Sequence, residues 1–228
     1  MKSLLDPSYW FSVARNPAAI AGLLVDLAPI VAIVFWGWGA AALVFLYWLE
    51  NLVIGFATVP RILLASFGRR GVKGLFGAAF NAAFFSVHYG IFCIGHGGML
   101  LEIFGIREAM SNADSIQQML GQMIDAAFGF GLHMDWVLAL IILFQALVFG
   151  REFILQGGWK EADPDKEMFA PYGRTIVLHI SVFVIAGALT ALGDPAIGAI
   201  ALVLARAVWG LHMNMRPRNQ AAPAPVPA

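Results

Sequence analysis

The stretch AAALVFLYWLENLVIGFATVPRILLASFGRRGVKG, residues 40–74, decides the fold. Its first part, 40–60, is apolar and holds one charged side chain, Glu50. A helix needs roughly 20 apolar residues to cross the hydrocarbon core of a bilayer, so this part predicts a transmembrane helix. Basic residues follow it directly at Arg61, Arg69, Arg70 and Lys73. Because Lys and Arg concentrate in cytoplasmic loops, they indicate which end of the helix lies inside.

Outward from this stretch, similar apolar runs recur along the chain. We expect transmembrane helices at 18–37, 40–60, 76–103, 134–155, 174–192 and 196–214. Backbone polar groups in lipid must be satisfied within their own segment, so these runs predict helices and not strands. Gly37-Trp38-Gly39 and Gly193-Asp194-Pro195 supply tight turns. The sequence therefore predicts an all-α, six-transmembrane bundle in one domain, 1–218, followed by a disordered Ala- and Pro-rich tail, 219–228.

The basic residues support this topology. With the N-terminus inside, Arg107 is the one basic residue of 14 on the outer side. The cytoplasmic side holds the others: Lys2, Arg15, Arg61, Arg69, Arg70, Lys73, Arg151, Lys160, Lys166, Arg174, Arg206, Arg216 and Arg218. An even number of spans places both termini in the cytoplasm, in agreement with the distribution of positive charge.

Composition excludes several classes of protein. The chain of 228 residues is 60% hydrophobic and 12% charged, about half the charge of an average soluble domain. The formal net charge is zero, so we expect the lipid bilayer as a partner and no nucleic acid. Cys93 is the single cysteine, which excludes an intramolecular disulfide and any Cys-x-x-Cys motif. Asp6, Pro7 and Arg15 interrupt the N-terminal segment, which does not resemble a secretory signal.

The longest outer connection, 105–133, carries apolar residues at helical spacing from Ile116 to Phe128. We expect an amphipathic helix there, with Asp114 and Gln117 as a capping box and Gly129 at its end. It could pack against the bundle or act as a lid over a site. The segment 157–173 is charged and turn-rich, which predicts a solvated cytoplasmic loop.

Polar side chains at membrane depth are candidates for a functional site, because each costs roughly 2.5–3.5 kcal/mol at mid-helix if it is charged. Counted from the predicted helix ends, one group falls near the midplane: Asp26, Glu50, Asn51, His88 and Gln145. A second falls nearer the cytoplasm: Glu152, His179, Arg206 and His212. A third falls toward the outside: His96, Glu102 and His133. We expect a polar centre made by Glu50, Asn51, His88 and Arg206.

The histidines are candidate metal ligands, since neutral imidazole is a common one. The candidates are His88, His96, His179 and His212. His88 and His96 share a helical face but lie about 12 Å apart along the axis, too far to bind one ion together. No His-Glu-x-x-His motif is present. A transition metal or haem are the cofactors that such histidines would hold, and haem needs only one or two axial ligands.

Four blocks carry a resemblance: LYWLEN (46–51), HYGIFCIGHG (88–97), MFAPYGRTIVLHI (168–180) and the last helix, which ends in His212. They resemble a family of bacterial multi-pass membrane proteins classed as a domain of unknown function. The resemblance covers the second to the sixth predicted helix. It implies the fold and the bacterial inner membrane, and it implies no reaction.

Three functions agree with these residues. The first is a membrane protein with a buried His/Glu centre that binds a metal ion, haem or protons. The second is an intramembrane metal-dependent enzyme, either an oxidoreductase or a lipid-modifying protein. The third is a structural or assembly subunit, in which the polar residues only join helices; such a protein could also be an oligomer.

Overall fold

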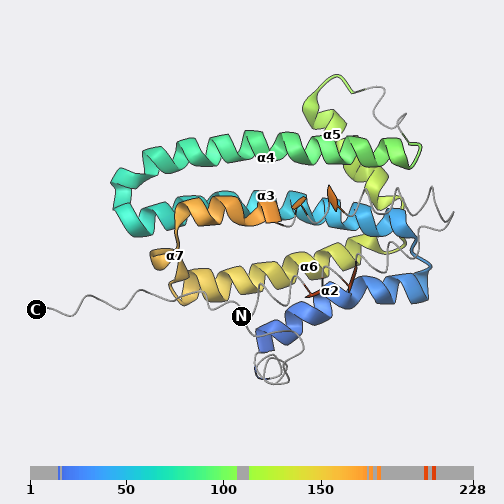
Figure 1. Ribbon diagram of the computed structural model, residues 1–228, viewed down its shortest axis with the longest axis horizontal. Helices are drawn as coiled ribbons and strands as arrows, with labels where there is room; N and C mark the ends of the chain where they lie inside the picture. Colours follow the sequence, from blue (N-terminus) through green and yellow to red (C-terminus); the bar gives the residue numbers. More distant parts are fainter. Residues whose placement is uncertain are drawn as a thin grey trace, which may run out of the picture.

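The computed structural model describes residues 15, 17–106, 113–173, 175–176, 179–180, 203–204 and 207–208. Its main helices are α2 (Pro17–Trp36), α3 (Ala40–Arg70), α4 (Leu75–Ile103), α5 (Ile116–Phe128), α6 (Met134–Val148) and α7 (Gly158–Glu161) (Figure 1). A 3-10 turn, η1 (Gly71–Gly74), joins α3 to α4, and a π-helical segment, η3 (Phe149–Leu155), continues α6. A further helical run covers 164–173. The all-α class is confirmed for these ranges.

Two helical stretches in the described ranges are long and apolar enough to cross a membrane, Ala40–Ile103 and Met134–Leu155. Ile20–Trp36 is apolar but shorter. The first stretch contains both α3 and α4, which fold back on each other at η1 (Figure 1). Most of the predicted helices at 174–192 and 196–214, and the tail at 219–228, lie outside the described residues.

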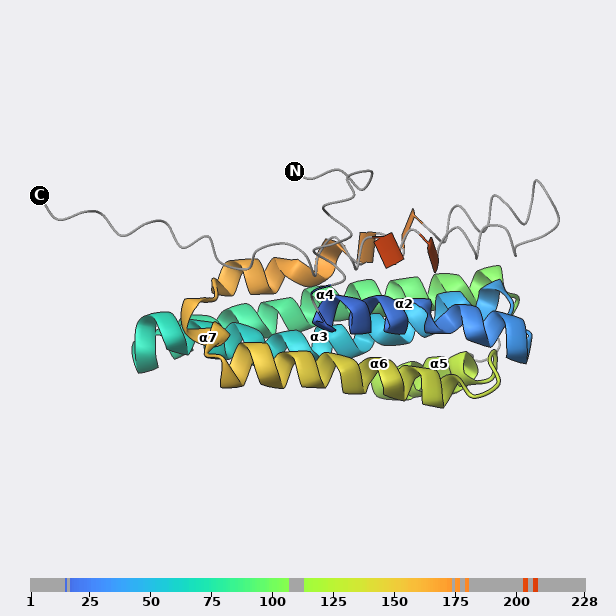
Figure 2. The same ribbon diagram turned by 90° about the horizontal axis from the view of Figure 1, so that it is seen from below.

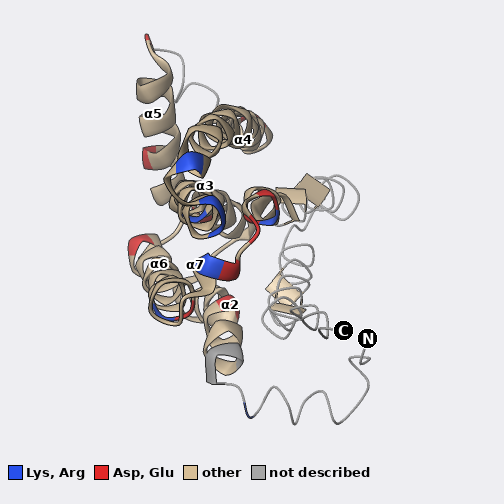
Figure 3. Ribbon diagram, turned by 90° about the vertical axis from the view of Figure 1, so that its left-hand side faces the viewer, with Lys and Arg blue, Asp and Glu red and all other residues tan. Residues whose placement is uncertain are grey.

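Helix α3 is the centre of the bundle. It contacts α4, α5, α6 and α7, while α2 packs on α6, and the view along the bundle shows α3 between its neighbours (Figure 3). Residues 42–51 are all buried. A helix that is apolar on every face belongs in the interior, which explains why this half of α3 is surrounded.

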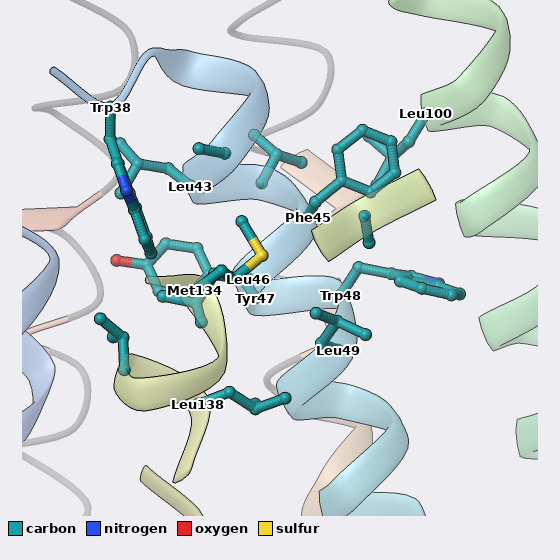
Figure 4. Packing of buried hydrophobic residues seen from close by; sticks show 14 of the residues in the cluster. Trp38, Leu43, Phe45, Leu46, Tyr47, Trp48, Leu49, Leu100, Met134 and Leu138 are labelled. Carbon is teal, nitrogen blue, oxygen red and sulfur yellow. The ribbon is translucent and has the colours of Figure 1, made fainter. Parts of the chain in front are cut away.

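The core around α3 is built from large side chains. Phe45 stacks on Phe130 with ring centroids 4.6 Å apart, and Trp48 is fully buried. Met123 and Ala127 of α5 have no exposed surface and belong to the same cluster, so α5 is a packing element on α3 and α4. Figure 4 shows the labelled side chains of this cluster, from Trp38 to Leu138, gathered around α3.

Contacts between side chains fix the directions of the helices. The Trp38 indole donates to the Leu132 carbonyl at one end of the bundle (2.9 Å), and the Arg61 guanidinium lies 4.8 Å from the Phe149 ring centroid nearer the other. Residue numbers therefore increase together along α3 and α6–η3, so these two run parallel. Helices α3 and α4 are antiparallel, because η1 reverses the chain between them and they pack against each other. These directions match the alternation predicted from the sequence.

Glycines allow the chain to reverse at two places. Gly37 (φ 66°) precedes α3, and Gly71 (φ 60°) opens η1. Both lie in the region of positive φ, which costs other residues energy that glycine avoids. The turn predicted at Gly37-Trp38-Gly39 is thereby confirmed.

Three predicted boundaries are wrong. α3 continues past residue 60 to Arg70, since Ile62, Ala65 and Ser66 remain buried. The predicted loop 157–173 is mostly helical, because Asp163 caps a helix that begins at Pro164; its Oδ1 accepts from the Asp165 N–H at 3.1 Å. Proline suits a first helical position, and Asp suits the position before it.

The third correction concerns α5. Ser115, and not Asp114, is its N-cap, with the hydroxyl accepting from the Gln118 N–H. The Gln118 side chain reaches back to the Asp114 N–H at 2.8 Å. The capping box is thus shifted by one residue from the predicted Asp114 and Gln117, and Gly129 ends the helix as expected.

Candidate functional site

The polar residues of α4 face the helical run that begins at 164, and the two elements form a polar seam. Figures 1 and 2 show this run alongside α3 and α4, starting near α7. Contacts join His88 to Tyr172, Tyr89 to Thr175 and His96 to His179. Numbers rise together on both sides, so the run is parallel to α4.

His96 and His179 form the closest polar contact in this seam. Nε2 of His96 lies 2.6 Å from Nδ1 of His179, and the rings meet edge to face. His96 is buried. Its other nitrogen, Nδ1, lies 2.7 Å from the Phe92 carbonyl. A carbonyl only accepts, so Nδ1 carries the proton and Nε2 of neutral His96 presents its lone pair to His179.

This contact changes the predicted depth of His179. We expected it nearer the cytoplasmic end, but it lies level with His96, which was predicted toward the outside. The reason is that the helical run begins at Pro164 in place of residue 174, which sets His179 further along the chain from the start of the run.

His88 makes a different contact in the seam, nearer the start of α4. Its Nδ1 lies 2.7 Å from the Tyr172 hydroxyl, and its ring stacks on Phe84. Unlike His96, it is exposed in the described structure. His88 and His96 therefore have separate partners, as their spacing along α4 predicted.

Tyr89 connects three helices. Its hydroxyl donates to the Asn51 carbonyl of α3 (3.3 Å) and lies 3.3 Å from the Thr175 hydroxyl, which can donate to it. Gly55 permits this approach, because a Cβ there would lie 2.6 Å from the Tyr89 ring. Tyr89 and Thr175 were not among the predicted candidates, although Tyr89 follows His88 directly and Thr175 precedes His179 by four residues.

Glu50 lies on another interface of α3. Its Oε1 accepts a hydrogen bond from the Gln145 amide of α6 (2.9 Å), and Glu50 is 1% exposed. Both residues were placed in the midplane group, and the structure brings these two together. Asn51 is buried beside Glu50, but its carbonyl faces the seam through Tyr89. Glu50 and His88 thus have their contacts on different interfaces.

The other candidates are dispersed. His133 caps α6 and lies with its ring edge against Trp36. Glu152 is part of η3, and Glu102 is exposed at the end of α4. Asp26 is half-buried in α2. Arg206 and His212 lie outside the described residues.

The seam supplies two metal-ligating groups at one point, His96 and His179. Among the described residues, no three side chains of His, Cys, Asp or Glu come together as a metal site would require. Cys93 is buried in the same face of α4, and its carbonyl accepts from the Trp48 indole at 2.8 Å.

Comparison with known proteins gives one result. No curated protein matches the chain, and no solved structure matches it. A family model matches residues 8–226, nearly the whole length. The chain belongs to this family, which is described as a family of unknown function, DUF6498.

Proposed function

We propose that this chain is a six-span protein of the bacterial inner membrane that holds a transition-metal ion between His96 and His179. The exposed faces of its helices support the proposed location in a membrane. On α4, large apolar side chains recur every three or four residues and are 53% to 89% exposed: Phe76, Phe80, Phe84, Val87 and Ile91. Soluble monomers rarely expose a continuous apolar face of this length, whereas lipid solvates it.

Helix α6 repeats the pattern with Trp136, Leu140, Leu143 and Leu147, all exposed. The described basic residues beyond Arg15 belong to the end of the bundle where η1 and α7 lie (Figure 3). This end is the one that the positive-inside rule assigns to the cytoplasm. With the helix that begins at Pro164 and the one predicted at 196–214, α2, α3, α4 and α6–η3 make six spans.

The contact between His96 and His179 is the observation that supports a metal. The hydrogen bond from Nδ1 of His96 to the Phe92 carbonyl fixes the tautomer and the ring orientation. Metal-ligating histidines almost always donate their other N–H in this way. Two imidazole ligands at about 2.0–2.1 Å from a tetrahedral ion stand roughly 3.3 Å apart. The observed 2.6 Å would need to widen by less than about 1 Å, a small rotation of one ring.

Imidazole suits zinc, copper, iron and nickel, so the proposed ion belongs to this group. Haem with both histidines as axial ligands does not fit, because the two nitrogens face each other within hydrogen-bond distance and leave no space for a macrocycle. His212 of the last predicted helix is the remaining candidate for a third ligand.

Metal analysis of the purified full-length protein tests this proposal. We expect wild-type protein to bind Zn²⁺, Cu²⁺ or Co²⁺, and His96→Ala and His179→Ala to weaken the affinity by at least about 100-fold, since each removes a ligand. Cobalt absorption and copper electron paramagnetic resonance report nitrogen ligands directly. His88→Ala is the matched control on the same helix and should bind the metal normally.

Two results would contradict the metal: wild-type protein that takes up none of these ions, or His96→Ala protein that keeps the wild-type affinity. The first result would favour a second candidate, proton transfer. The observation behind it is the succession of hydrogen-bonded groups in the seam: His88 with Tyr172, Tyr89 with Thr175, and His96 with His179. Proton flux into proteoliposomes should then stop in His96→Ala and slow in Tyr172→Phe.

A further inference from the structure

A polar cavity lies at the cytoplasmic end of the bundle, away from the seam contacts. The end of α3, the start of α4 and the beginning of the run at 164 line it, and its volume is about 490 Å³. This volume is within the usual range for sites that bind small molecules. Charged and polar side chains line it together with two aromatic rings: Ser66, Arg69, Arg70, Asn81, Asp163, Asp165, Phe76 and Phe80.

Four charged side chains line this cavity, and two of them, Arg69 and Asp163, form an ion pair. Nη1 of Arg69 lies 3.4 Å from Oδ2 of Asp163, while Oδ1 of Asp163 caps the helix by accepting from the Asp165 N–H. Both oxygens of Asp163 are therefore engaged. One guanidinium, Arg70, and one carboxylate, Asp165, line the same cavity, and both residues are exposed. The cavity thus offers one positive and one negative group to a ligand.

Two exposed aromatic rings also line the cavity. Phe76 is 89% exposed and Phe80 is 71% exposed, and both belong to the first turns of α4, on its apolar face. In the proposed membrane orientation, these rings lie in lipid and the charged side chains lie at the level of the headgroups. A ligand that fills the cavity would then have a zwitterionic head and apolar chains.

We infer that this cavity binds a phospholipid with an ethanolamine headgroup from the inner leaflet. Arg70 would bind the phosphate, the ligand that a guanidinium fits best. Asp165 would accept hydrogen bonds from the primary ammonium, and the acyl chains would lie along Phe76 and Phe80. A purely anionic headgroup leaves Asp165 facing a negative charge, and a choline headgroup has no N–H to donate to it. This inference rests on the membrane part of the proposed function and not on the metal.

The test uses the full-length protein, stripped of lipid in detergent. Micelles are doped with phosphatidylethanolamine, phosphatidylcholine or phosphatidylglycerol, and a separate sample receives soluble phosphoethanolamine. Thermal unfolding and native mass spectrometry measure binding. We expect phosphatidylethanolamine to raise the Tm most. Arg70→Gln and Asp165→Asn should each weaken this binding about tenfold or more, the loss expected for one charge-assisted hydrogen bond.

Lys73→Gln is the matched control, because Lys73 lies in η1 beside these residues but does not line the cavity. It should bind like wild type. Equal binding of the three lipids would overturn the inference, as would wild-type affinity in both cavity variants. A Tm shift of the same size with soluble phosphoethanolamine would assign the cavity to a soluble ligand and also overturn it. Protein that is absent from the membrane fraction would instead defeat the proposed membrane location.

Discussion

On one side of α3, Glu50 accepts a hydrogen bond from Gln145 of α6; on the other, α4 meets the run from 164 through His96 and His179. Each contact has one buried polar side chain among apolar helices, Glu50 in the first and His96 in the second, while His179 is exposed. They differ in what surrounds them. Buried residues of the main hydrophobic cluster adjoin Glu50 in sequence and on α6, among them Leu46, Leu49 and Ile141. The histidines lie in a seam that also holds the polar contacts of His88 with Tyr172 and of Tyr89 with Thr175.

This difference separates two uses of buried polarity. A carboxylate that accepts from an amide inside a packed cluster joins two helices, and its removal leaves both a cavity and an unsatisfied donor. A histidine such as His96, whose tautomer is fixed by a backbone carbonyl, presents a lone pair at a defined point, as a metal ligand does. We therefore expect Glu50 to contribute to stability, and His96 with His179 to contribute to the proposed metal binding.

The largest expected effect is on stability at Glu50. Glu50→Ala should lower the free energy of unfolding by about 2–5 kcal/mol, because it opens a cavity and leaves the Gln145 amide without this acceptor. Chemical denaturation in mixed micelles measures it. His96→Ala, studied without metal, should cost about 1–3 kcal/mol. An equal loss of unfolding free energy in His96→Ala and Glu50→Ala would contradict the different roles expected for the two residues, since both would then be structural.

A glycine next to His96 gives a smaller effect. A Cβ on Gly97 would lie 2.7 Å from the Trp48 ring and also overlap Met123. Gly97→Ala should destabilise by about 1–3 kcal/mol through overpacking, and it should also weaken metal binding by shifting α4 away from α3. Thermal unfolding and metal titration check both effects.

Gly95→Ala is the matched control, because a Cβ at Gly95 meets open space. It should leave stability unchanged or raise it by about 0.5–1 kcal/mol, as expected for alanine in a helix. If both variants behaved alike, the close approach of α4 to α3 would not be what positions His96.

Several parts of the fold could be predicted from the sequence. The bounds of α2, α4 and α6 with η3 follow from the lengths of their apolar runs and lie within two residues of the expected 18–37, 76–103 and 134–155. The far end of α3 could not be predicted this way. The predicted span ended at residue 60, but the helix continues to Arg70, and the Arg61 guanidinium lies over Phe149 and Phe153.

The sequence predicted which residues belong to the candidate site better than it predicted which of them are in contact. His96, His179, Glu50 and Gln145 were all candidates, yet depth counting grouped Glu50 with His88 and set His179 apart from His96. Counting along one helix gives depth but not the direction that a side chain faces. The Asp163-Pro164 step, a cap followed by a favourable first helical residue, is the signal that would have placed His179 correctly.

Tyr89 tests how far the seam depends on contacts to α3. Tyr89→Phe removes the hydrogen bond to the Asn51 carbonyl and should cost about 0.5–1.5 kcal/mol. Tyr172→Phe removes a hydrogen bond to His88 and should cost less, because the His88 ring is exposed and can rotate to another partner, whereas the group that Tyr89 contacts belongs to the buried Asn51. Thermal unfolding ranks the two variants, and a larger loss for Tyr172→Phe would contradict the burial assigned to them.

The smallest effect is expected from Glu50→Gln, which tests how much the hydrogen bond between residue 50 and Gln145 contributes to stability. The amide oxygen of glutamine can still accept from the Gln145 Nε2, and the side-chain volume is retained, so the change in unfolding free energy should stay below about 1 kcal/mol. Glu50→Leu has similar volume but no acceptor, and the unsatisfied amide should then cost about 1–3 kcal/mol. Equal stabilities for the two variants would show that packing, and not the hydrogen bond, holds α3 to α6. Metal binding should be unaffected in both, because Glu50 and the histidines have their contacts on different interfaces of the bundle.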